Sequence, residues 1–553
     1  MDYKTLYAHW CAHADESTVK ELSGLSDAEI YDRFYTAMEF GTGGLRGVIG
    51  AGTNRINKYT VRKATQGFAM YIKALGEDAC RRGVVIAHDN RRLSVEFSKE
   101  TAGVLAANGI VAYLFDALRP TPELSFAVRQ LKAAGGVMIT ASHNPPEYNG
   151  YKVYDENGCQ LVPHLNDRVV AYINEIEDEL ALPSLSAEQS GGLIKAVPAE
   201  VDEIYYTQVM KIRINKDVDT KALRVVYSPQ HGTGNVPVRT VLSRLGYDLV
   251  PVLSQCEPDT EFSNTKNPNP ETKEAFELPV QTARETNADI AITTDPDCDR
   301  LGVAVKQGQD YVLMTGNQSG AVLLKYIIEQ RIKSGTMPEN PIMFNTIVTS
   351  DIGDKICQKY GVAVEKTLTG FKFIGDKIHK YEQSGEKQFL FGYEESYGYL
   401  ISDIVRDKDA VQSSLMLCEA AAYYKAQGKT LYDILLEIYA EFGYYLDAQT
   451  NVVLKGADGA EKIQQLLREL RNNPPKAADD IAVVKVEDYL SQEMIDAGFS
   501  KSNVLKYTMS DGSWIAVRPS GTEPKCKYYY CVTAKDKDAA AQKLALFKNI
   551  FEQ

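Results

Sequence analysis

The chain has 553 residues, of which 44% are hydrophobic and 24% charged, and these proportions are typical of a folded globular protein rather than a disordered one. A chain of this length holds about three or four domains. Its 61 lysine and arginine residues against 74 aspartate and glutamate residues give a net charge of −13, so the overall field favours neither nucleic acid nor an anionic membrane as a partner. Any site that binds phosphate must therefore be local.

The nine cysteines are scattered along the chain without a CxxC pair, which argues against a disulfide framework and against a zinc site. The first residues, MDYKTLYAHWCAHADEST, carry charges where a signal peptide needs an apolar core, and they lack the arginine-rich bias of a transit peptide. No apolar stretch approaches the roughly 18 residues that a membrane span needs. We therefore expect a cytoplasmic protein without membrane or nucleic-acid partners.

Residues 1–40 are expected to form a helical extension, in which Ser26 caps a helix and Glu29 completes a capping box. Strands then alternate with helices, as in a mostly parallel sheet covered by helices. The alternation restarts after a stretch rich in Pro, Ser, Glu and Gly near 182–199, which we interpret as a linker, and restarts again near 317. We therefore predict three similar α/β domains with mixed sheets, at residues 41–200 (I), 201–316 (II) and 317–444 (III).

From about residue 445 the pattern changes to short alternating strands with two helices, EKIQQLLREL and AAAQKLALFKNIF. This pattern predicts a C-terminal α+β domain with an antiparallel sheet at residues 445–553 (IV). In each of the first three domains a strand ends in a polar loop, and open α/β sheets bind ligands at the carboxyl ends of their strands. The polar loops are therefore the candidate sites.

The loop TASHNPPEYNGYK (140–152) places a hydroxyl, Ser142, beside His143 and upstream of Lys152. A hydroxyl nucleophile needs a proton acceptor, and a nearby cation stabilises the charge that develops. The alternative is an ordinary turn in which these side chains cap backbone groups.

The loop DPDCDR (295–300) alternates three carboxylates, those of Asp295, Asp297 and Asp299, which can converge on one hard cation. A calcium EF-hand begins similarly, but it needs Gly at its sixth position and Glu at its twelfth, which this chain lacks. An acidic surface turn is the alternative. We expect Cys298, inside the loop, to point away from the cation.

Two further stretches carry groups that suit a sugar phosphate. RPSGTEPK (518–525) offers a guanidinium, hydroxyls, close backbone N–H groups and a lysine, which can hold a phosphate; its alternative is a turn between strands. GYEESYGY (392–399) offers Glu394 and Ser396 to sugar hydroxyls, or is an exposed acidic loop. In TGFKFIG, Lys372 is by itself more consistent with a snorkelling side chain at a helix start.

These loops, in this order along nearly the whole chain, resemble those of the α-D-phosphohexomutase superfamily, the phosphoglucomutases and phosphomannomutases. In that family TASHNP carries the phosphorylated serine, DxDxDR the magnesium ligands, GEES-type loops the sugar contacts and RxSGTEP the grip on the distal phosphate. The long N-terminal lead and the forms GTGGLRG and GYEESYGY look most like the branch of bacterial phosphoglucomutases and the eukaryotic phosphoglucomutase-2 and phosphopentomutase group. The resemblance implies a heart-shaped molecule of four domains.

The resemblance also implies roles for individual residues. Ser142 would hold the transferring phosphoryl group, and its oxygen would bind one Mg²⁺ together with Asp295, Asp297 and Asp299. The groups near the reacting oxygens would be Arg46, His143, Lys152, His231 and Lys372. Lys372 is the better candidate to carry a proton, with His143 second. The groups that bind the sugar and its distal phosphate, or support the metal loop, would be Arg300, Glu394, Ser396, Arg518, Ser520, Gly521, Thr522 and Lys525.

The implied reaction interconverts α-D-glucose 1-phosphate and glucose 6-phosphate through glucose 1,6-bisphosphate, which also serves as activator. Phosphomannomutase and phosphopentomutase activities stay open as alternatives, with a glucose-1,6-bisphosphate synthase or a catalytically silent binding protein behind them. The chain departs from the family at Tyr393, where Gly is common, and at Ala410, where KDG is common. Tyr393 leaves the sugar preference open. We expect a monomer or a weak homo-oligomer.

Overall fold

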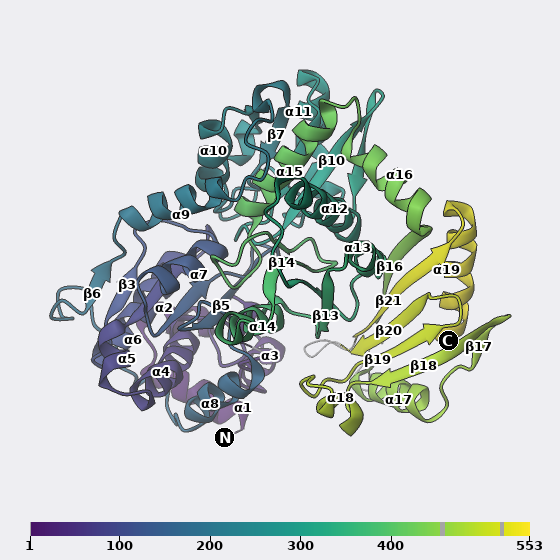
Figure 1. Ribbon diagram of the computed structural model, residues 1–553. Coiled ribbons are helices and arrows are strands. Elements are labelled where there is room, and N and C mark those ends of the chain that lie inside the picture. Colours follow the sequence, from purple (N-terminus) through teal and green to yellow (C-terminus); the bar gives the residue numbers. More distant parts are fainter. Residues whose placement is uncertain (1, 42, 454–458, 520–524, 553) are drawn as a thin grey trace.

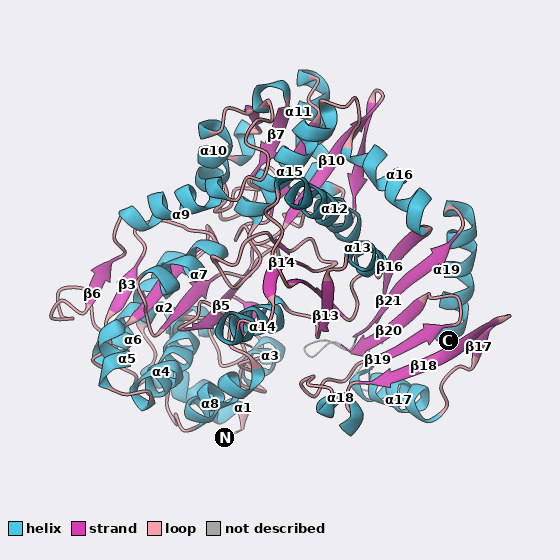
Figure 2. Ribbon diagram, viewed as in Figure 1, coloured by secondary structure: helices cyan, strands magenta, loops and turns pink. Residues whose placement is uncertain are grey.

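The computed structural model describes residues 2–41, 43–453, 459–519 and 525–552. Figure 1 shows domain I in purple and blue, domain II in teal, domain III in green at the centre and domain IV in yellow-green at the opposite side from domain I. Helices flank the strands in all four domains (Figure 2). Among the described residues, no helix is both long and apolar enough to cross a membrane.

The N-terminal extension consists of three helices: α1 (Tyr3–His13), α2 (Glu16–Leu22) and α3 (Asp27–Phe34). The predicted capping box is confirmed, because the Ser26 hydroxyl accepts from the Glu29 amide while a Glu29 carboxylate oxygen accepts from the Ser26 amide at 2.8 Å. Trp10, Leu22 and Phe34 pack into one cluster with Tyr59 of the first long helix of domain I. The extension is therefore attached to domain I.

The first three domains alternate strands and helices as predicted. Domain I contains β1 (Gly44–Val48), α4 (Lys58–Ala74), α5 (Glu77–Arg82), β2 (Val84–His88), α6 (Ser94–Ala107), β3 (Ala112–Leu114), α7 (Thr121–Gln130), β4 (Gly135–Ile139), β5 (Tyr148–Asp155), α8 (Pro163–Asn174) and β6 (Ile194–Ala196). Domain II contains α9 (Glu200–Lys211), β7 (Arg224–Ser228), α10 (Asn235–Arg244), β8 (Asp248–Pro251), α11 (Glu277–Thr286), β9 (Ile290–Thr294), β10 (Leu301–Gln307) and β11 (Asp310–Met314). Domain III contains α12 (Gly316–Ser334), β12 (Pro341–Thr346), α13 (Ile352–Tyr360), β13 (Ala363–Thr367), α14 (Phe371–Ser384), β14 (Gln388–Tyr393), β15 (Tyr399–Leu400), α15 (Ala410–Lys425) and α16 (Leu431–Phe442).

The three sheets share one four-strand topology. Their common orders are β5-β4-β2-β3, β10-β9-β7-β8 and β15-β14-β12-β13, so in each domain the chain visits the four positions in the same sequence. In each, the first strand is parallel to the second and third, and the fourth is antiparallel to the third. The prediction of three similar α/β domains with mixed sheets is thereby confirmed.

The stretch near 182–199, interpreted from its composition as a linker, is instead packed against domain I. Its strand β6 pairs with β3, where Ile194 lies opposite Ala112. A Cβ added to Gly103 of α6 would come within 2.2 Å of the Ser184 hydroxyl, so helix and segment touch closely. Pro and Gly indicate turns, but they do not reveal that the three residues between the turns join a sheet edge.

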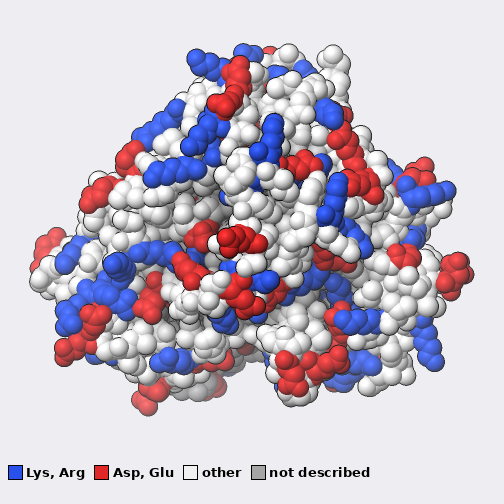
Figure 3. All heavy atoms as spheres, viewed as in Figure 1, with Lys and Arg blue, Asp and Glu red and all other residues white. Residues whose placement is uncertain are grey.

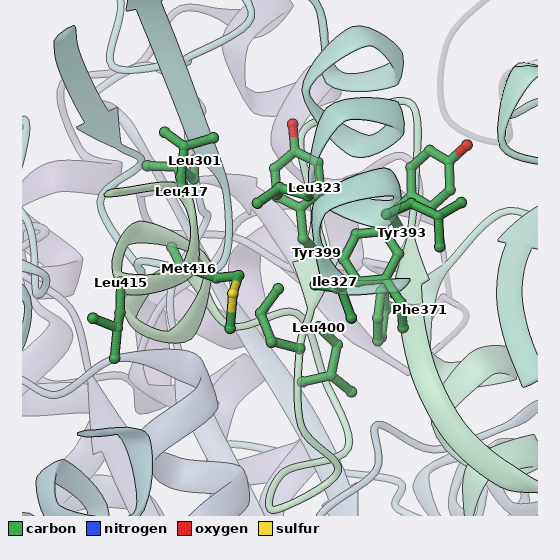
Figure 4. Close-up of a cluster of buried hydrophobic side chains, with 14 of the residues drawn as sticks. Leu301, Leu323, Ile327, Phe371, Tyr393, Tyr399, Leu400, Leu415, Met416 and Leu417 are labelled. Atoms are coloured by element: carbon green, nitrogen blue, oxygen red, sulfur yellow. The ribbon is translucent and has the colours of Figure 1, made fainter. Parts of the chain in front are cut away.

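Domains I, II and III share a continuous hydrophobic core. Figure 4 shows its central part, where Tyr399 and Leu400 of β15 lie between Leu323 of α12 and Met416 of α15. Leu301 of β10, in domain II, belongs to the same cluster. Close packing of this kind fixes the loops of the three domains relative to one another.

Domain IV has the antiparallel sheet that the sequence predicts, in the order β16-β21-β20-β19-β18-β17. Its elements are β16 (Tyr444–Val453), α17 (Gly459–Asn472), β17 (Ala477–Ala478), β18 (Ile481–Asp488), α18 (Gln492–Asp496), β19 (Leu505–Met509), β20 (Trp514–Pro519), β21 (Lys525–Ala534) and α19 (Lys537–Phe551). Helices α17 and α19 pack on one face of the sheet and form a core of their own with it (Figure 2). Trp514, Ala516, Tyr529 and Cys531 of the same sheet belong to the core shared with the other domains.

Candidate active site

The candidate loops occupy equivalent places in the three repeated sheets. Ser142 follows β4, Asp295 follows β9 and Glu394 follows β14, and each of these is the third strand of its domain. The carboxyl ends of such strands are where open α/β sheets bind ligands. The shared topology therefore delivers a hydroxyl, a set of carboxylates and the predicted sugar loop to the same ends of their sheets.

The loop after the first strand braces the loop after the third strand in each domain. In domain I, buried Arg91 donates to the carbonyl oxygens of Ser142 at 2.6 Å and Tyr148 at 3.0 Å. In domain II, the Thr233 amide donates to the Pro296 carbonyl at 2.8 Å. In domain III, the Thr349 hydroxyl donates to Glu395 at 3.1 Å. In all three domains, the loop after the first strand thus donates a hydrogen bond that holds the loop after the third strand.

Ser142 is held in a strained conformation against the acidic loop. Its φ of 51° lies in the left-handed region, which non-glycine residues adopt rarely and mostly at functional sites. The residue is 3% exposed, and its hydroxyl donates to Asp295 Oδ2 at 2.7 Å and lies 3.2 Å from His143 Nδ1. Burial, with the charges of Arg300 and Arg46, lowers the pKa of His143 well below its usual value, so this imidazole is neutral and able to accept a proton.

The acidic loop brings three buried carboxylates together. Ligand oxygens of Asp295, Asp297 and Asp299 all lie within 4.8 Å of one another. Asp297 Oδ1 and Asp299 Oδ1 are buried without a hydrogen-bond partner in the described part of the chain. Burial and the neighbouring carboxylates raise the pKa of Asp295 well above its usual value. Oxygen ligands with unpartnered lone pairs fit a hard divalent cation, which would stabilise all three charges.

Two lysines surround the outer side of these carboxylates. Lys152 of β5 lies 2.7 Å from Asp297 Oδ2, and Lys408, after β15, lies 3.2 Å from Asp299 Oδ2. Burial alone would lower the pKa of Lys152, but Asp297 and Asp299 raise it above its usual value, so the amine stays charged. The Cys298 sulfur lies beside Gly234, where an added Cβ would come within 2.9 Å of it, and it is not part of the group formed by the three carboxylates.

The sugar loop presents two carboxylates that differ in their partners. Glu394 is 4% exposed and accepts a hydrogen bond from the Gly370 amide at 2.8 Å. Burial raises the pKa of Glu394 to about 7, although Lys408 opposes the shift. Glu395 accepts from the hydroxyls of Thr346 and Thr349 and lines the central cleft together with Ser396.

Tyr393 does not reach the substrate side of this loop. Its ring is fully buried and stacks on Phe391 at 5.4 Å between centroids. A Cβ at Gly320 would come within 2.4 Å of the ring, and one at Gly353 within 2.3 Å of its hydroxyl, so these two glycines make room for it. Figure 4 shows the ring directed into the core beside α12. The departure from Gly is therefore a matter of core packing.

A cleft of about 650 Å³ joins the loops of all four domains. Its polar and charged lining includes Arg46, His143, Asn269, Glu271, Arg300, Glu395, Ser396, Asp447, Gln449, Arg518 and Lys527. Over the face shown in Figure 3, acidic and basic side chains are interspersed and form no single-sign patch. The cations on the two sides of the cleft are therefore a local feature, as the net charge predicts.

The remaining predicted residues that the structure describes are not among those that line this cleft. Lys372 lines a small adjoining cavity of about 100 Å³ that also contacts Arg518. His231 is buried behind the acidic loop, where its Nδ1 lies 2.8 Å from the Glu257 carbonyl, and it is not among the cleft-lining residues. Lys525 begins β21, while Ser520, Gly521 and Thr522 lie outside the described residues.

Family models match the chain in all four parts. Those for the α/β/α domains I, II and III of phosphoglucomutase/phosphomannomutase match residues 37–180, 203–308 and 315–442, and that for the C-terminal domain matches residues 460–548. The chain belongs to the phosphoglucomutase/phosphomannomutase family. The matches follow the four sheets and include the serine, acidic and sugar loops.

Individual members of the family are similar over almost the full length. A phosphoglucomutase of Staphylococcus epidermidis is 39% identical over 97% of this chain and 98% of its own, and one of Staphylococcus aureus is 37% identical over 97% of both. Among solved structures, parafusin (phosphoglucomutase) of Paramecium, in an open form, aligns with a TM-score of 0.71 at 19% identity over 94% of this chain and 96% of its own. A phosphoglucomutase/phosphomannomutase family protein of Burkholderia thailandensis gives 0.68 at 19% identity over 92% and 96%. These two structures share the fold.

Three charged residues of the site are absent from the sequence-based set. Lys408 contacts the metal loop, Glu271 lies 2.5 Å from Arg300, and Lys527 lines the cleft. The segment RDKDA drew attention only through Ala410, although its lysine is the charged group that enters the site. Glu271 carries no comparable signal, because it stands in a loop far from any motif.

Proposed function

We propose that this member of the family is a phosphoglucomutase, which interconverts α-D-glucose 1-phosphate and glucose 6-phosphate through glucose 1,6-bisphosphate. The observation that carries the proposal is Ser142, whose hydroxyl bonds to Asp295 of a triad with unpartnered oxygens, directly beside His143, which lines a cleft that also contains cationic groups. The names of the relatives at 37–39% identity support glucose as the sugar. We further propose that the protein acts in the cytoplasm as a monomer or weak homo-oligomer.

In this proposal Ser142 carries the phosphoryl group and Asp295, Asp297 and Asp299 hold Mg²⁺. When bound, Mg²⁺ would supply positive charge beside the transferring group. Arg46, which donates to Asn144 at 3.2 Å at the edge of the serine loop, adds a second positive charge there. Electrostatic stabilisation of this kind dominates phosphoryl transfer.

The other residues bind and orient the sugar phosphate. Glu394 and Ser396 would hold its hydroxyls, while the clamp on its non-reacting phosphate would consist of Arg518, Ser520, Gly521, Thr522 and Lys525. Lys372 would remove the proton from the attacking hydroxyl, because burial lowers its pKa to about 8 and makes the neutral amine accessible. His143 is the second candidate for that role. Arg300, Lys152 and His231 would support the reacting end.

The bisphosphorylated sugar must turn within the cleft so that its other phosphate returns to Ser142. One set of loops then serves both ends of the substrate. We propose that domain IV, which has a core of its own besides its contacts with the shared core, closes over the sugar and reopens for the turn.

The direct test compares turnover of glucose 1-phosphate, mannose 1-phosphate and ribose 1-phosphate by one preparation supplied with Mg²⁺ and glucose 1,6-bisphosphate. We expect the highest kcat/KM for glucose 1-phosphate. A preference for mannose or ribose would redirect the assignment within the family. No turnover of any of the three, with Ser142 shown to be intact, would contradict the catalytic role.

A further inference from the structure

The side chains of Arg300 and Asp299 lie close together without forming a hydrogen bond between Nε and Oδ1. Arg300 Nε lies 3.8 Å from Asp299 Oδ1, which is beyond hydrogen-bond distance. Both atoms are buried, and neither has a hydrogen-bond partner in the described part of the chain. An unmet buried donor next to an unmet buried carboxylate oxygen is costly, so some other contact must hold the two apart.

That contact is the ion pair between Arg300 and Glu271. Arg300 Nη1 donates to Glu271 Oε1 at 2.5 Å, and both residues line the cleft. The Glu271 amide in turn donates to Asn269 at 3.1 Å, which fixes the loop that carries the carboxylate. Burial opposes the charge on Arg300, but Glu271 and Asp299 raise the pKa of the guanidinium, so it stays charged between the two carboxylates.

Asp299 Oδ1 is the oxygen that matters for a cation. The other oxygen, Oδ2, already faces Lys408 at 3.2 Å and Lys152 at 3.5 Å. Of the cationic side chains in the described residues that pair with Asp299, Arg300 is the one that makes its approach to Oδ1 rather than to Oδ2. A guanidinium released from Glu271 would pair with this oxygen and compete with the metal.

We propose that Glu271 is a positioning residue that holds Arg300 back from Asp299 and so keeps Asp299 Oδ1 available to the divalent cation. This inference rests on the metal role assigned to the acidic loop under the proposed function. It adds to that role a residue from a separate loop of domain II that controls cation affinity without touching the cation.

Calorimetric titration of Mg²⁺ into the full-length protein tests the idea without relying on turnover. Intact mass first confirms that every sample is unphosphorylated, because a phosphoserine would change the affinity. Glu271→Gln should bind Mg²⁺ about tenfold more weakly than wild type. The matched control is Glu261→Gln, a carboxylate of the same domain that pairs with Arg92 outside the cleft, and it should leave the affinity unchanged.

A double variant separates competition by Arg300 from the direct loss of a negative charge. If Arg300 is the competitor, adding Glu271→Gln to Arg300→Gln should change Mg²⁺ affinity by less than about twofold. The contrary result is that Glu271→Gln weakens Mg²⁺ binding in the Arg300→Gln background as much as it does in wild type. That result would mean that Glu271 acts directly on the cation, and it would overturn the inference. Unchanged affinity in Glu271→Gln alone would overturn it as well.

Turnover gives a second readout that a general folding defect would not reproduce. Raising Mg²⁺ should restore most of the kcat of Glu271→Gln, whereas a misfolded variant stays impaired at every Mg²⁺ concentration. A wild type that binds no Mg²⁺ would instead remove the metal assignment, and this inference with it. A wild type that binds Mg²⁺ but turns over no sugar phosphate would leave the inference testable and contradict the proposed function alone.

Discussion

The Ser142 hydroxyl donates to Asp295 across a domain boundary, over a distance of 2.7 Å. The two residues follow equivalent strands, β4 and β9, in two separate sheets. Their contact depends on the packing between domains I and II, to which Thr121 of α7 contributes by donating to Asp297 at 2.9 Å. A phosphoryl group on Ser142 would therefore enter directly beside the acidic triad.

Replacing Ser142 by Ala should abolish mutase turnover and leave binding of glucose 1-phosphate largely intact. The hydroxyl is the proposed carrier of the phosphoryl group, and alanine has no nucleophile to replace it. Incubation with glucose 1,6-bisphosphate followed by intact mass spectrometry should show one added phosphoryl group on wild type and none on the variant. Turnover near the wild-type rate in Ser142→Ala would refute the mechanism.

Asp297→Asn should lower turnover by roughly a hundredfold or more, because it removes a charge from the cation site. The amide keeps the shape of the side chain, so the contact with Thr121 can remain. Chelation of the wild type should silence it, and added Mg²⁺ should restore it. The control is Asp310→Asn, an exposed carboxylate of the same domain that pairs with Arg284, which should keep full activity. Full activity after exhaustive chelation would contradict the metal assignment.

Arg518→Ala should weaken the sugar phosphate strongly. Loss of a charged contact whose partner stays buried costs about 2–5 kcal/mol, so KM should rise far more than kcat falls. Phosphorylation of Ser142 by glucose 1,6-bisphosphate should suffer as well, since that ligand uses the same clamp. Arg468→Ala, an exposed arginine on α17, is the matched control. An unchanged KM in Arg518→Ala would count against the clamp.

The sequence could predict Ser142 and the three aspartates because each stands in a short motif whose neighbours decide its position. It could predict the repeated sheets because strand and helix patterns are local. The contacts of Lys408 and Glu271 with the acidic loop could not be predicted, because both residues belong to other segments and only the packed fold brings them there. The orientation of Tyr393 could not be predicted either, since it depends on space left by Gly320 and Gly353 in two different helices.

The rate of glucose 6-phosphate formation should rise with pH through about 8, where half of the Lys372 amine is neutral, and level off about one pH unit higher. Burial lowers the pKa of Lys372 to about 8, so the fraction of neutral amine able to accept a proton grows through this range. Lys372→Arg should abolish this rise, because arginine stays protonated. Lys377→Arg on the same helix, where the lysine pairs with Glu365, should keep the wild-type profile. A profile unaffected by Lys372→Arg would exclude Lys372 as the proton acceptor.

The lowered pKa of Lys372 also makes the stability of the protein depend on pH. Between pH 8 and 10.5 the folded protein binds fewer protons at Lys372 than the unfolded chain does, so the contribution of this group to the free energy of unfolding increases with pH over that window. Chemical denaturation of wild type and Lys372→Met at pH 8 and pH 10 measures it. The free energy of unfolding of wild type, relative to that of Lys372→Met, should increase from pH 8 to pH 10.

Glu394→Gln should cut kcat/KM for glucose 1-phosphate far more than for ribose 1-phosphate. A site built to hydrogen-bond a substrate hydroxyl loses most when that partnership is removed, and a furanose cannot present the same pair of adjacent hydroxyls as a pyranose. The pKa of Glu394 is raised to about 7 by burial, so the ionised carboxylate should also be lost below that pH in wild type, and the hexose preference should weaken there. Glutamine should remove this pH dependence.

Measurements of both sugars on both proteins at pH 6 and pH 8 distinguish the outcomes. Equal losses for hexose and pentose would mean that Glu394 supports the loop through the Gly370 amide rather than selecting the sugar.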